Sequence, residues 1–242
     1  MKDGTYSVRT NEYEFVMTVN EYKGIYKIKY GDPHNREGPC VEFTYDVRKP
    51  TRLKLDNLEY KNTCSRDVHL KRGEGTIHML KSALLLICKE FVDIKRVYLN
   101  DVATIHCNGH NLLLAYLYIL CYGHTWYSKH FGAKPSDKII KEELASINKK
   151  LNSKGSISLF NLKIDPSLTW MEYFFSKKTH CKLFVDIMDD IKSLIRVNLM
   201  YSEWYINKKV IISWMDDMNV VLKPSSHTGG GVWDTPRGHR VA

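Results

Sequence analysis

The sequence lacks several features that would place it in a well-defined class. Its six cysteines include no Cys-x-x-Cys pair, and their scattered positions argue against both a zinc ribbon and a disulfide framework. We therefore expect most of them to be buried thiols. No run approaches the roughly 18 consecutive apolar residues of a membrane-spanning helix, and the first residues contain no apolar segment of the signal-peptide type. These absences predict a cytoplasmic protein of a reducing compartment, with no membrane partner.

Two glycine motifs of nucleotide-binding proteins are also missing. The chain has neither the G-K-[ST] ending of a P-loop nor the G-x-G-x-x-G of a dinucleotide site. Acidic residues are outnumbered, with 27 Asp and Glu against 36 Lys and Arg, which leaves a formal charge of +9. Such an excess favours polyanionic partners such as nucleic acid, or an anionic cofactor. With 242 residues and 43% hydrophobic content, the chain can form one large domain or two small ones around a sizeable core.

The N-terminal part consists of short β-prone runs separated by turn residues. Several of the runs alternate apolar with polar residues, as half-buried antiparallel strands do. Glycine, proline, aspartate and asparagine stand between them, where turns require these residues. This pattern predicts an antiparallel β-meander with the strands EFVMTV (14–19), GIYKIKY (24–30), CVEFTYDV (40–47) and RLKLDNLEY (52–60).

A helical pattern follows the meander. Apolar residues recur at three- and four-residue spacing from Thr76 to Phe91, which predicts a helix, and IKRVYLN (94–100) reads as a strand. The segment from Asp67 to Leu99 thus has the form strand, glycine turn, helix, strand. A parallel strand pair with a right-handed crossover is the simplest topology for it.

The C-terminal half is predicted to be mostly helical. Asn111 to Tyr122 is apolar almost all round and predicts a buried helix that ends at Gly123. The tail 225–242 has three consecutive glycines and no periodicity, so we expect a flexible extension. The remaining predicted elements are a helix from Asp137 to Leu151, a strand at 156–164, helices from Leu168 to Phe175 and from about Leu183 to Trp204, and a strand or helix at 208–215.

The turn KRGEGT, residues 71–76, is the first candidate for a binding site. The first N–H groups of a helix have no partner within it, and the helix dipole places partial positive charge there. Gly73 and Gly75 would let the backbone approach a pyrophosphate, while Lys71 and Arg72 add charge. The alternative is an ordinary strand-to-helix connection with Thr76 as N-cap. The residues by themselves leave both interpretations open.

This stretch resembles the acetyl-coenzyme A loop of the GCN5-related N-acetyltransferases (GNAT). The family pattern [RQ]-x-x-G-x-[GA] lies between a strand and a helix, and here it reads from Arg72 to Ile77, with isoleucine in place of the final glycine or alanine. IKRVYLND is similar to the next strand of the family. TWYSKHFGA, with Tyr127 before Phe131 and Gly132, is similar to its helix-ending tyrosine and "GF" signature.

The resemblance covers roughly residues 60–135 and implies a GNAT-like α/β domain at 1–135, carrying a helical extension at 136–224. The pair of helices that the family inserts after its first strand is absent, so its acceptor region cannot be carried over. The unit together with YGHTWYSKHFGA is also similar to acetyltransferase-like proteins of nucleocytoplasmic large DNA viruses. A viral protein of this kind would lie in the host cytoplasm or in the virion.

The resemblance also implies roles for individual residues. Lys71, Arg72, Gly73, Gly75 and Thr76 would hold the pyrophosphate of acetyl-coenzyme A.

Tyr127 would protonate the departing thiolate, because a tyrosine has this role in the family. His124 or His130 could deprotonate an amine acceptor, with Glu74 and Asp101 as alternatives for the base. The other interpretation of the two histidines is that they pack beside Trp126 as turn residues.

Two weaker patterns remain. His106 and His110 have the i, i+4 spacing of metal ligands on a helix, but Asn108 and Gly109 interrupt that helix, so we predict no metal site. A basic stripe could bind nucleic acid, although a solvated helix face is the simpler interpretation; it would comprise Lys138, Lys141, Lys149, Lys150 and Lys154.

The sequence thus predicts an α+β or α/β fold and an acetyl-coenzyme A-dependent N-acetyltransferase acting on an unknown amine. The alternatives are a non-catalytic basic binding or structural protein that retains an acetyltransferase-like fold, and a nucleic-acid-binding protein.

Overall fold

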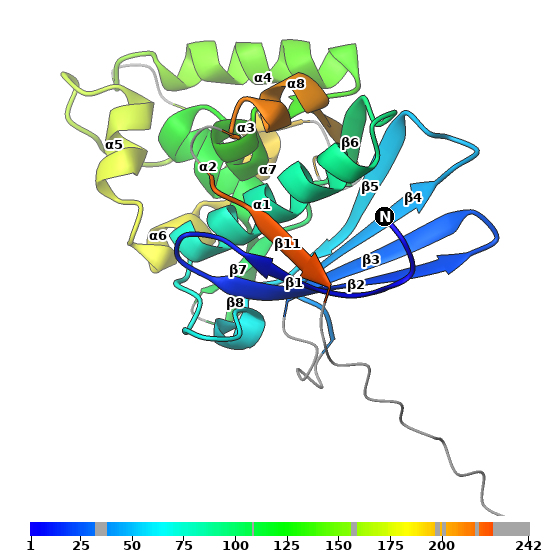
Figure 1. Cartoon of the computed structure of the whole chain (residues 1–242). Coiled ribbons are helices and arrows are strands. Elements are labelled where there is room, and N and C mark those ends of the chain that lie inside the picture. The colour runs from blue at the N-terminus through cyan, green and yellow to red at the C-terminus, as the bar shows by residue number, and fades with distance from the viewer. Residues whose placement is uncertain are drawn as a thin grey trace, which may run out of the picture.

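The chain folds as an α+β structure built on one large sheet (Figure 1). The computed structural model describes residues 1–31, 38–107, 109–155, 159–196, 199, 202–215 and 218–224. Within these residues, nine strands form the sheet in the order β11-β1-β2-β3-β4-β5-β6-β10-β9. Their bounds are β1 Gly4–Arg9, β2 Glu14–Tyr22, β3 Ile25–Gly31, β4 Val41–Asp46, β5 Arg52–Leu58, β6 Arg96–Asn100, β9 Lys134–Pro135, β10 Glu203–Asn207 and β11 Val221–Pro224.

The predicted meander is confirmed, because the four β-prone runs form β2 to β5 and each pairs antiparallel with the next. β5 and β6 are paired parallel, and every other neighbouring pair in this sheet is antiparallel. The helix between β5 and β6 provides the crossover that a parallel pair requires. The predicted parallel pair joined through this helix is therefore present, but its first strand is β5, because no strand forms directly before the glycine turn.

The helices lie together on one side of the sheet (Figure 1). A separate two-stranded hairpin, β7 Thr104–Cys107 and β8 His110–Leu113, precedes α2. The helices are α1 Glu74–Glu90, α2 Leu114–Tyr122, α3 Trp126–Phe131, α4 Lys138–Leu151, α5 Trp170–Ser176, α6 Cys181–Asp186, α7 Met188–Leu194 and α8 Lys208–Ile212, with a short 3-10 helix at Asn62–Cys64.

Helix α1 is central because both of its sides are buried. Toward the sheet, Ser82 is hydrogen-bonded to the Tyr30 hydroxyl, with 2.8 Å between the oxygens, and Phe91 after its end packs against Tyr45. On the other side α1 packs against α8. The apolar spacing that predicted the helix therefore reflects burial on more than one face, and the buried residues include Leu80, Ala83, Leu84 and Ile87.

The opposite face of the sheet is open to solvent. Along β5, β6 and β10 the residues alternate, so that Leu53, Val97 and Trp204 are buried while Arg52 and Arg96 are exposed. Side chains that share this open face include Lys27, Lys29, Thr44, Lys54, Tyr98, Glu203 and Tyr205. Packing on one side alone explains the alternation that the sequence shows.

The segment 136–224, predicted as a helical extension, also contributes strands to the sheet. β10 inserts between β6 and β9, and β11 pairs with β1 at the other edge, so segments 1–135 and 136–224 share one sheet. None of the described helices combines the length and the apolar character needed to cross a membrane.

Several predicted element boundaries are wrong. Residues 159–164 form no strand, and the rest of the predicted strand 156–164 lies outside the described residues. The helix expected from Leu183 to Trp204 is divided into α6 and α7, and its last residues belong to β10, where Trp204 lies opposite Leu99 of β6. Pairing with a strand distant in sequence overrides the local helical spacing. The predicted tail 225–242 lies outside the described residues.

The expectation that the cysteines are mostly free thiols is also wrong. Cys40 is disulfide-bonded to Cys64 and Cys107 to Cys181, while Cys88 and Cys121 are buried and free. The partners are 24 and 74 residues apart, and folding brings their Cα atoms to 6.0 and 5.6 Å. Such pairs leave no signature in local spacing.

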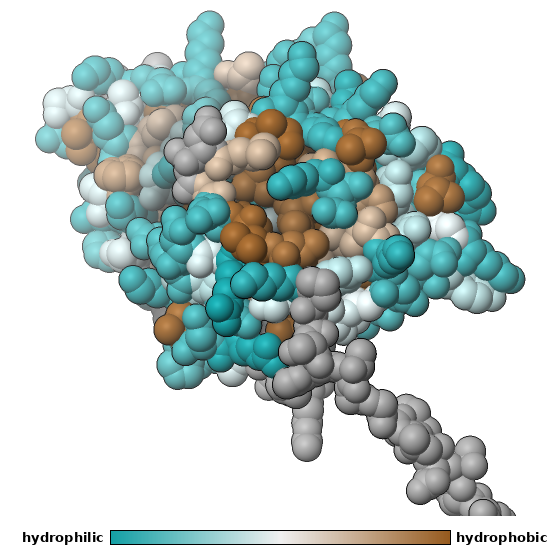
Figure 2. All heavy atoms as spheres, in the orientation of Figure 1, coloured by the Kyte–Doolittle hydropathy of each residue, from teal (hydrophilic) through white to brown (hydrophobic). Residues whose placement is uncertain are grey.

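Apolar residues gather in the middle of the face drawn in Figure 2, near α1 and β11 in the orientation of Figure 1. A hollow of about 300 Å³ lies between these two elements. Its apolar lining residues are Leu85, Leu86, Met215, Met218, Val220, Val221 and Leu222.

Candidate functional site

The candidate site lies where the parallel strands end. β5 and β6 are paired at Arg52 with Arg96, Leu53 with Val97 and Lys54 with Tyr98, but not beyond. β5 continues to Leu58 and β6 to Asn100, so their carboxyl ends are not joined to each other. The crossover helix α1 begins at the same edge. In sheets with parallel strands, ligands bind outside the carboxyl ends of the strands.

The loop that leads to α1 is long, and the N-terminal strands hold it in place. Residues 59–73 connect β5 to α1 and form no strand, so the strand expected directly before the glycine turn is absent. The disulfide from Cys64 to Cys40 attaches the loop to the beginning of β4. The Glu59 N–H also donates to the Cys40 carbonyl at 2.7 Å, and the Tyr60 hydroxyl donates to the Leu70 carbonyl at 3.0 Å.

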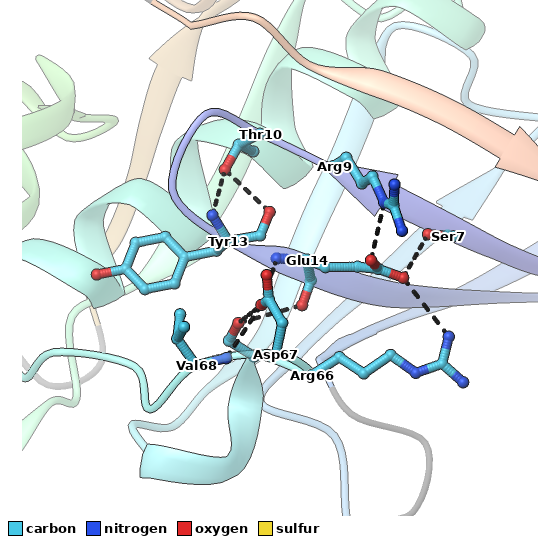
Figure 3. Close-up of polar contacts among 9 residues, drawn as sticks. Ser7, Arg9, Thr10, Tyr13, Glu14, Arg66, Asp67 and Val68 are labelled. Carbon is cyan, nitrogen blue, oxygen red and sulfur yellow. Dashed lines mark hydrogen bonds and ion pairs between the residues drawn. The ribbon is translucent and has the colours of Figure 1, made fainter.

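A polar network attaches the second half of the loop to the β1–β2 hairpin (Figure 3). The Asp67 carboxylate accepts hydrogen bonds from the Glu14 N–H at 3.0 Å, the Ser65 hydroxyl at 2.9 Å and the Val68 N–H at 3.1 Å. Partial burial raises the pKa of Asp67, but these hydrogen bonds outweigh it, so the net shift of the pKa is downward. The ionised form of Asp67 therefore stabilises the loop.

Glu14 contributes a second carboxylate to this network. It accepts from the Ser7 hydroxyl at 2.9 Å and from Arg9 Nε at 2.8 Å, and Arg66 Nη1 lies 3.6 Å from it. Desolvation raises the pKa of Glu14, but the hydrogen bonds from Ser7 and Arg9 lower it by more, so the net shift of the pKa is downward. Asp67 and Glu14 are therefore ionised at neutral pH, and in this form both hold the loop against the β1–β2 hairpin.

The glycine turn has a defined geometry at the start of α1. Gly73 is the N-cap residue with φ of 81°, a conformation that L side chains rarely adopt. The Ile77 N–H donates to its carbonyl at 3.0 Å. Thr76 lies within the first turn and is buried, so the alternative in which it caps the helix is wrong.

The two glycines differ in their surroundings. A Cβ on Gly73 would meet no atom within 4 Å, whereas one on Gly75 would lie 2.9 Å from Leu70 Cγ. Gly75 is therefore required by packing inside the protein, and Gly73 is the residue that faces solvent. Lys71 and Arg72 are exposed beside Gly73, so two cations flank the N-terminus of α1.

Tyr127, the predicted acid, lies inside the molecule. It is 4% exposed, on α3, with its ring centroid 4.9 Å from that of Trp126. Burial raises its pKa, and the nearby Asp101 raises it further, so the phenol remains protonated.

His124 is exposed, and neither a hydrogen bond nor a ring contact joins it to Tyr127 in the described part of the chain. The structure thus places Tyr127 close enough to Asp101 for the carboxyl group to influence its pKa, and leaves His124 apart. No hydrogen bond, ion pair or ring contact among the described residues links Tyr127 to the turn 71–76.

Asp101 is a fully buried acid. It follows β6 directly and is 0% exposed, and neither carboxylate oxygen has a hydrogen-bond partner among the described residues. Desolvation raises its pKa to about 7, although the nearby Thr125 side chain and Ala103 backbone oppose the shift. The sequence offered Asp101 as one of several bases. Its burial and its proximity to Tyr127 became apparent only from the structure.

The other candidate residues do not join this site. His130 is half-buried and packs against Tyr118 and Trp126, as the packing interpretation expected, and burial lowers its pKa. His106 and His110 lie on the two strands of the β7–β8 hairpin instead of one helical face. In the described part of the chain, no three His, Cys, Asp or Glu side chains are grouped as metal ligands would be.

Sequence reasoning missed the parts that fix the loop. The Asp67 and Glu14 network and the Cys40–Cys64 disulfide depend on contacts between residues 53 and 24 positions apart. Only the cations and glycines of the turn form a local signal.

No protein-family model, curated protein or solved structure matches this chain.

Proposed function

We propose that the protein binds acetyl-coenzyme A and transfers the acetyl group to an amine. The observation that carries the proposal is the N-terminus of α1, a 17-residue helix that starts at Gly73 beside the exposed Lys71 and Arg72. It lies at the carboxyl ends of a parallel strand pair. Free N–H groups, the helix dipole and two cations together suit a pyrophosphate.

Direct transfer requires two proton movements. The amine nitrogen attacks the thioester carbonyl, the C–S bond breaks, the thiolate takes a proton and the amine loses one. Tyr127 carries the phenol that would donate the proton to sulfur; its raised pKa keeps it protonated and makes it a weaker acid than an exposed tyrosine. Asp101, with a pKa of about 7, is suited to accept the proton of the amine, better than the exposed His124. Both groups are enclosed, so the thioester would have to enter the interior beside α3.

Calorimetric titration with acetyl-coenzyme A tests the binding step. Arg72→Ala is the informative variant because Arg72 is exposed, whereas a bulky residue at Gly75 would collide with Leu70 and disturb folding. We expect saturable binding, competed by free coenzyme A and weakened roughly tenfold by Arg72→Ala, as loss of a charge-assisted hydrogen bond predicts. Lys149→Ala on α4 is the matched control and should leave the affinity unchanged.

Transfer itself is tested with Tyr127→Phe, which removes the acid and retains the ring. Release of free coenzyme A in the presence of a panel of amines should fall by about 10² or more, while affinity for acetyl-coenzyme A is retained. Absence of binding in the wild type would reject the proposal. Binding without turnover for any amine would favour the non-catalytic alternative, a basic binding protein that retains the fold.

A further inference from the structure

Two arginines and two tyrosines form a continuous series on the open face of the sheet. The Arg52 guanidinium carbon lies 3.7 Å from the Tyr98 ring centroid, and that of Arg96 lies 4.6 Å from the Tyr205 centroid. Tyr98 and Tyr205 are opposite each other on β6 and β10, with centroids 6.3 Å apart. The order Arg52, Tyr98, Tyr205, Arg96 thus places planar groups side by side across three strands. We call these four residues the stacked series.

A large basic cleft adjoins one end of the stacked series. Its volume is about 1110 Å³, the carboxyl end of β10 and the amino end of β6 contribute to its lining, and Arg96 belongs to both the cleft and the series. One carboxylate, Asp93, lines the cleft against four cations, which are Lys95, Arg96, Lys208 and Lys209.

A second hollow, of about 300 Å³, lies at the other end, and its lining includes Arg52, Lys54 and Tyr98. The stacked series therefore connects two hollows along β6.

Within the described residues, the cations of the cleft form no ion pair with a carboxylate, unlike two cations at the other end of the stacked series. Arg52 is paired with Glu203 at 2.9 Å and Lys54 with Asp56 at 2.9 Å. By contrast, none of the ion pairs in the described part of the chain includes Lys95, Arg96 or Lys209. Uncompensated cations in a concave surface raise the local concentration of an anionic ligand.

We propose that this face binds single-stranded nucleic acid, with phosphates in the basic cleft and bases on the stacked series. Sequence-tolerant binding of single strands combines a positively charged groove with planar side chains on which bases stack, and arginine planes serve as well as aromatic rings. A duplex keeps its bases stacked on one another and could use only the cations. An acidic peptide would also use the cations without requiring the rings. The proposal does not depend on the acetyl transfer proposed above.

Fluorescence anisotropy with a labelled oligothymidylate or oligouridylate of about 15 nucleotides measures this binding directly. We expect saturable binding by the full chain that is tighter than binding to a duplex of equal length. Tyr205→Ala should weaken binding roughly five- to a hundredfold, the range reported for loss of one stacked base, while Tyr205→Phe should retain the wild-type affinity. Arg96→Ala should weaken binding and lower the slope of log affinity against log salt by about one.

Two controls determine how the result is interpreted. Lys163→Ala, an exposed cation outside the cleft and the stacked series, should change neither affinity nor salt slope, and thermal unfolding should show that all variants are folded. The proposal is overturned if no single strand binds, if a duplex binds as tightly, or if Lys163→Ala weakens binding as much as Arg96→Ala. It is also overturned if Tyr205→Phe and Tyr205→Ala behave alike, because ring stacking would then have no part.

Discussion

Asp101 illustrates how one side chain couples stability to pH. Its carboxyl group is enclosed, and burial raises its pKa to about 7 from an ordinary value near 3.8. Between these two values the folded state holds a proton that the unfolded state releases. The free energy of unfolding should therefore decrease as pH rises through this window, by about 1.4 kcal/mol per pH unit from this group alone.

The variant Asp101→Asn removes this dependence. We expect it to be more stable than the wild type at pH 8 and to lose that advantage as the pH falls below the ordinary pKa near 3.8, where the wild-type group is protonated in both states. Urea unfolding of both proteins across this range measures the difference. If Asp101→Asn were instead less stable than the wild type at pH 8, and this deficit became smaller at pH 4, the carboxylate would be ionised and favourably bound in the folded protein.

At the scale of single elements, the loop before α1 owes its position to cross-links. The Cys40–Cys64 disulfide closes a segment of 24 residues, and the loop-entropy relation assigns such a closure roughly 3 kcal/mol of stability. The double variant Cys40→Ser/Cys64→Ser should unfold at correspondingly lower urea. As a check on the pairing, thiol labelling of the unreduced, denatured wild type should modify Cys88 and Cys121 alone. Labelling of all six cysteines would contradict it.

Helix α5 begins with a capping box. The Thr169 hydroxyl accepts from the Glu172 N–H at 3.2 Å, and the Glu172 carboxylate accepts from the Thr169 N–H at 2.8 Å. Thr169→Ala should lower the free energy of unfolding by about 1 kcal/mol, whereas Thr169→Ser should retain most of it. Equal losses in the two variants would show that the hydroxyl does not cap the helix.

At the scale of the whole molecule, the last described strand completes the sheet. β11 covers the edge strand β1, with Tyr6 opposite Pro224 and Arg9 opposite Val221, and its residues help line the apolar hollow beside α1. Truncation after Val220 should lower the midpoint of thermal unfolding and promote dimers through the uncovered edge of β1. Truncation after Pro224 removes no described contact and should leave the midpoint unchanged. Light scattering and calorimetry compare the two truncated proteins, and equal destabilisation would contradict the role of β11.

Local periodicity predicted the parts of this fold whose environment is set by near neighbours. β2 to β5 and α4 show the alternation or helical spacing of one buried face, α1 shows helical spacing with burial on more than one face, and Asp137, the first residue of the predicted helix, is the N-cap of α4. The predicted helix wrongly extends over the first two residues of β10, because the strand depends on pairing with β6. For the site, the glycines and cations of residues 71–76 were visible in the sequence. The enclosure of Asp101 was not, because residues from distant segments cover it.

The order of the strands also has a consequence for synthesis of the chain. β6 can pair with its second neighbour, β10, only when Glu203–Asn207 has been made. β1 can pair with its second neighbour, β11, only when Val221–Pro224 has been made. A ribosome that has released the first 200 residues therefore carries a meander with two unsatisfied edges. The sheet of the nascent chain is complete only when its last strands have been made. Until then its two edge strands are exposed, and we expect chaperones that cover exposed strands to bind it.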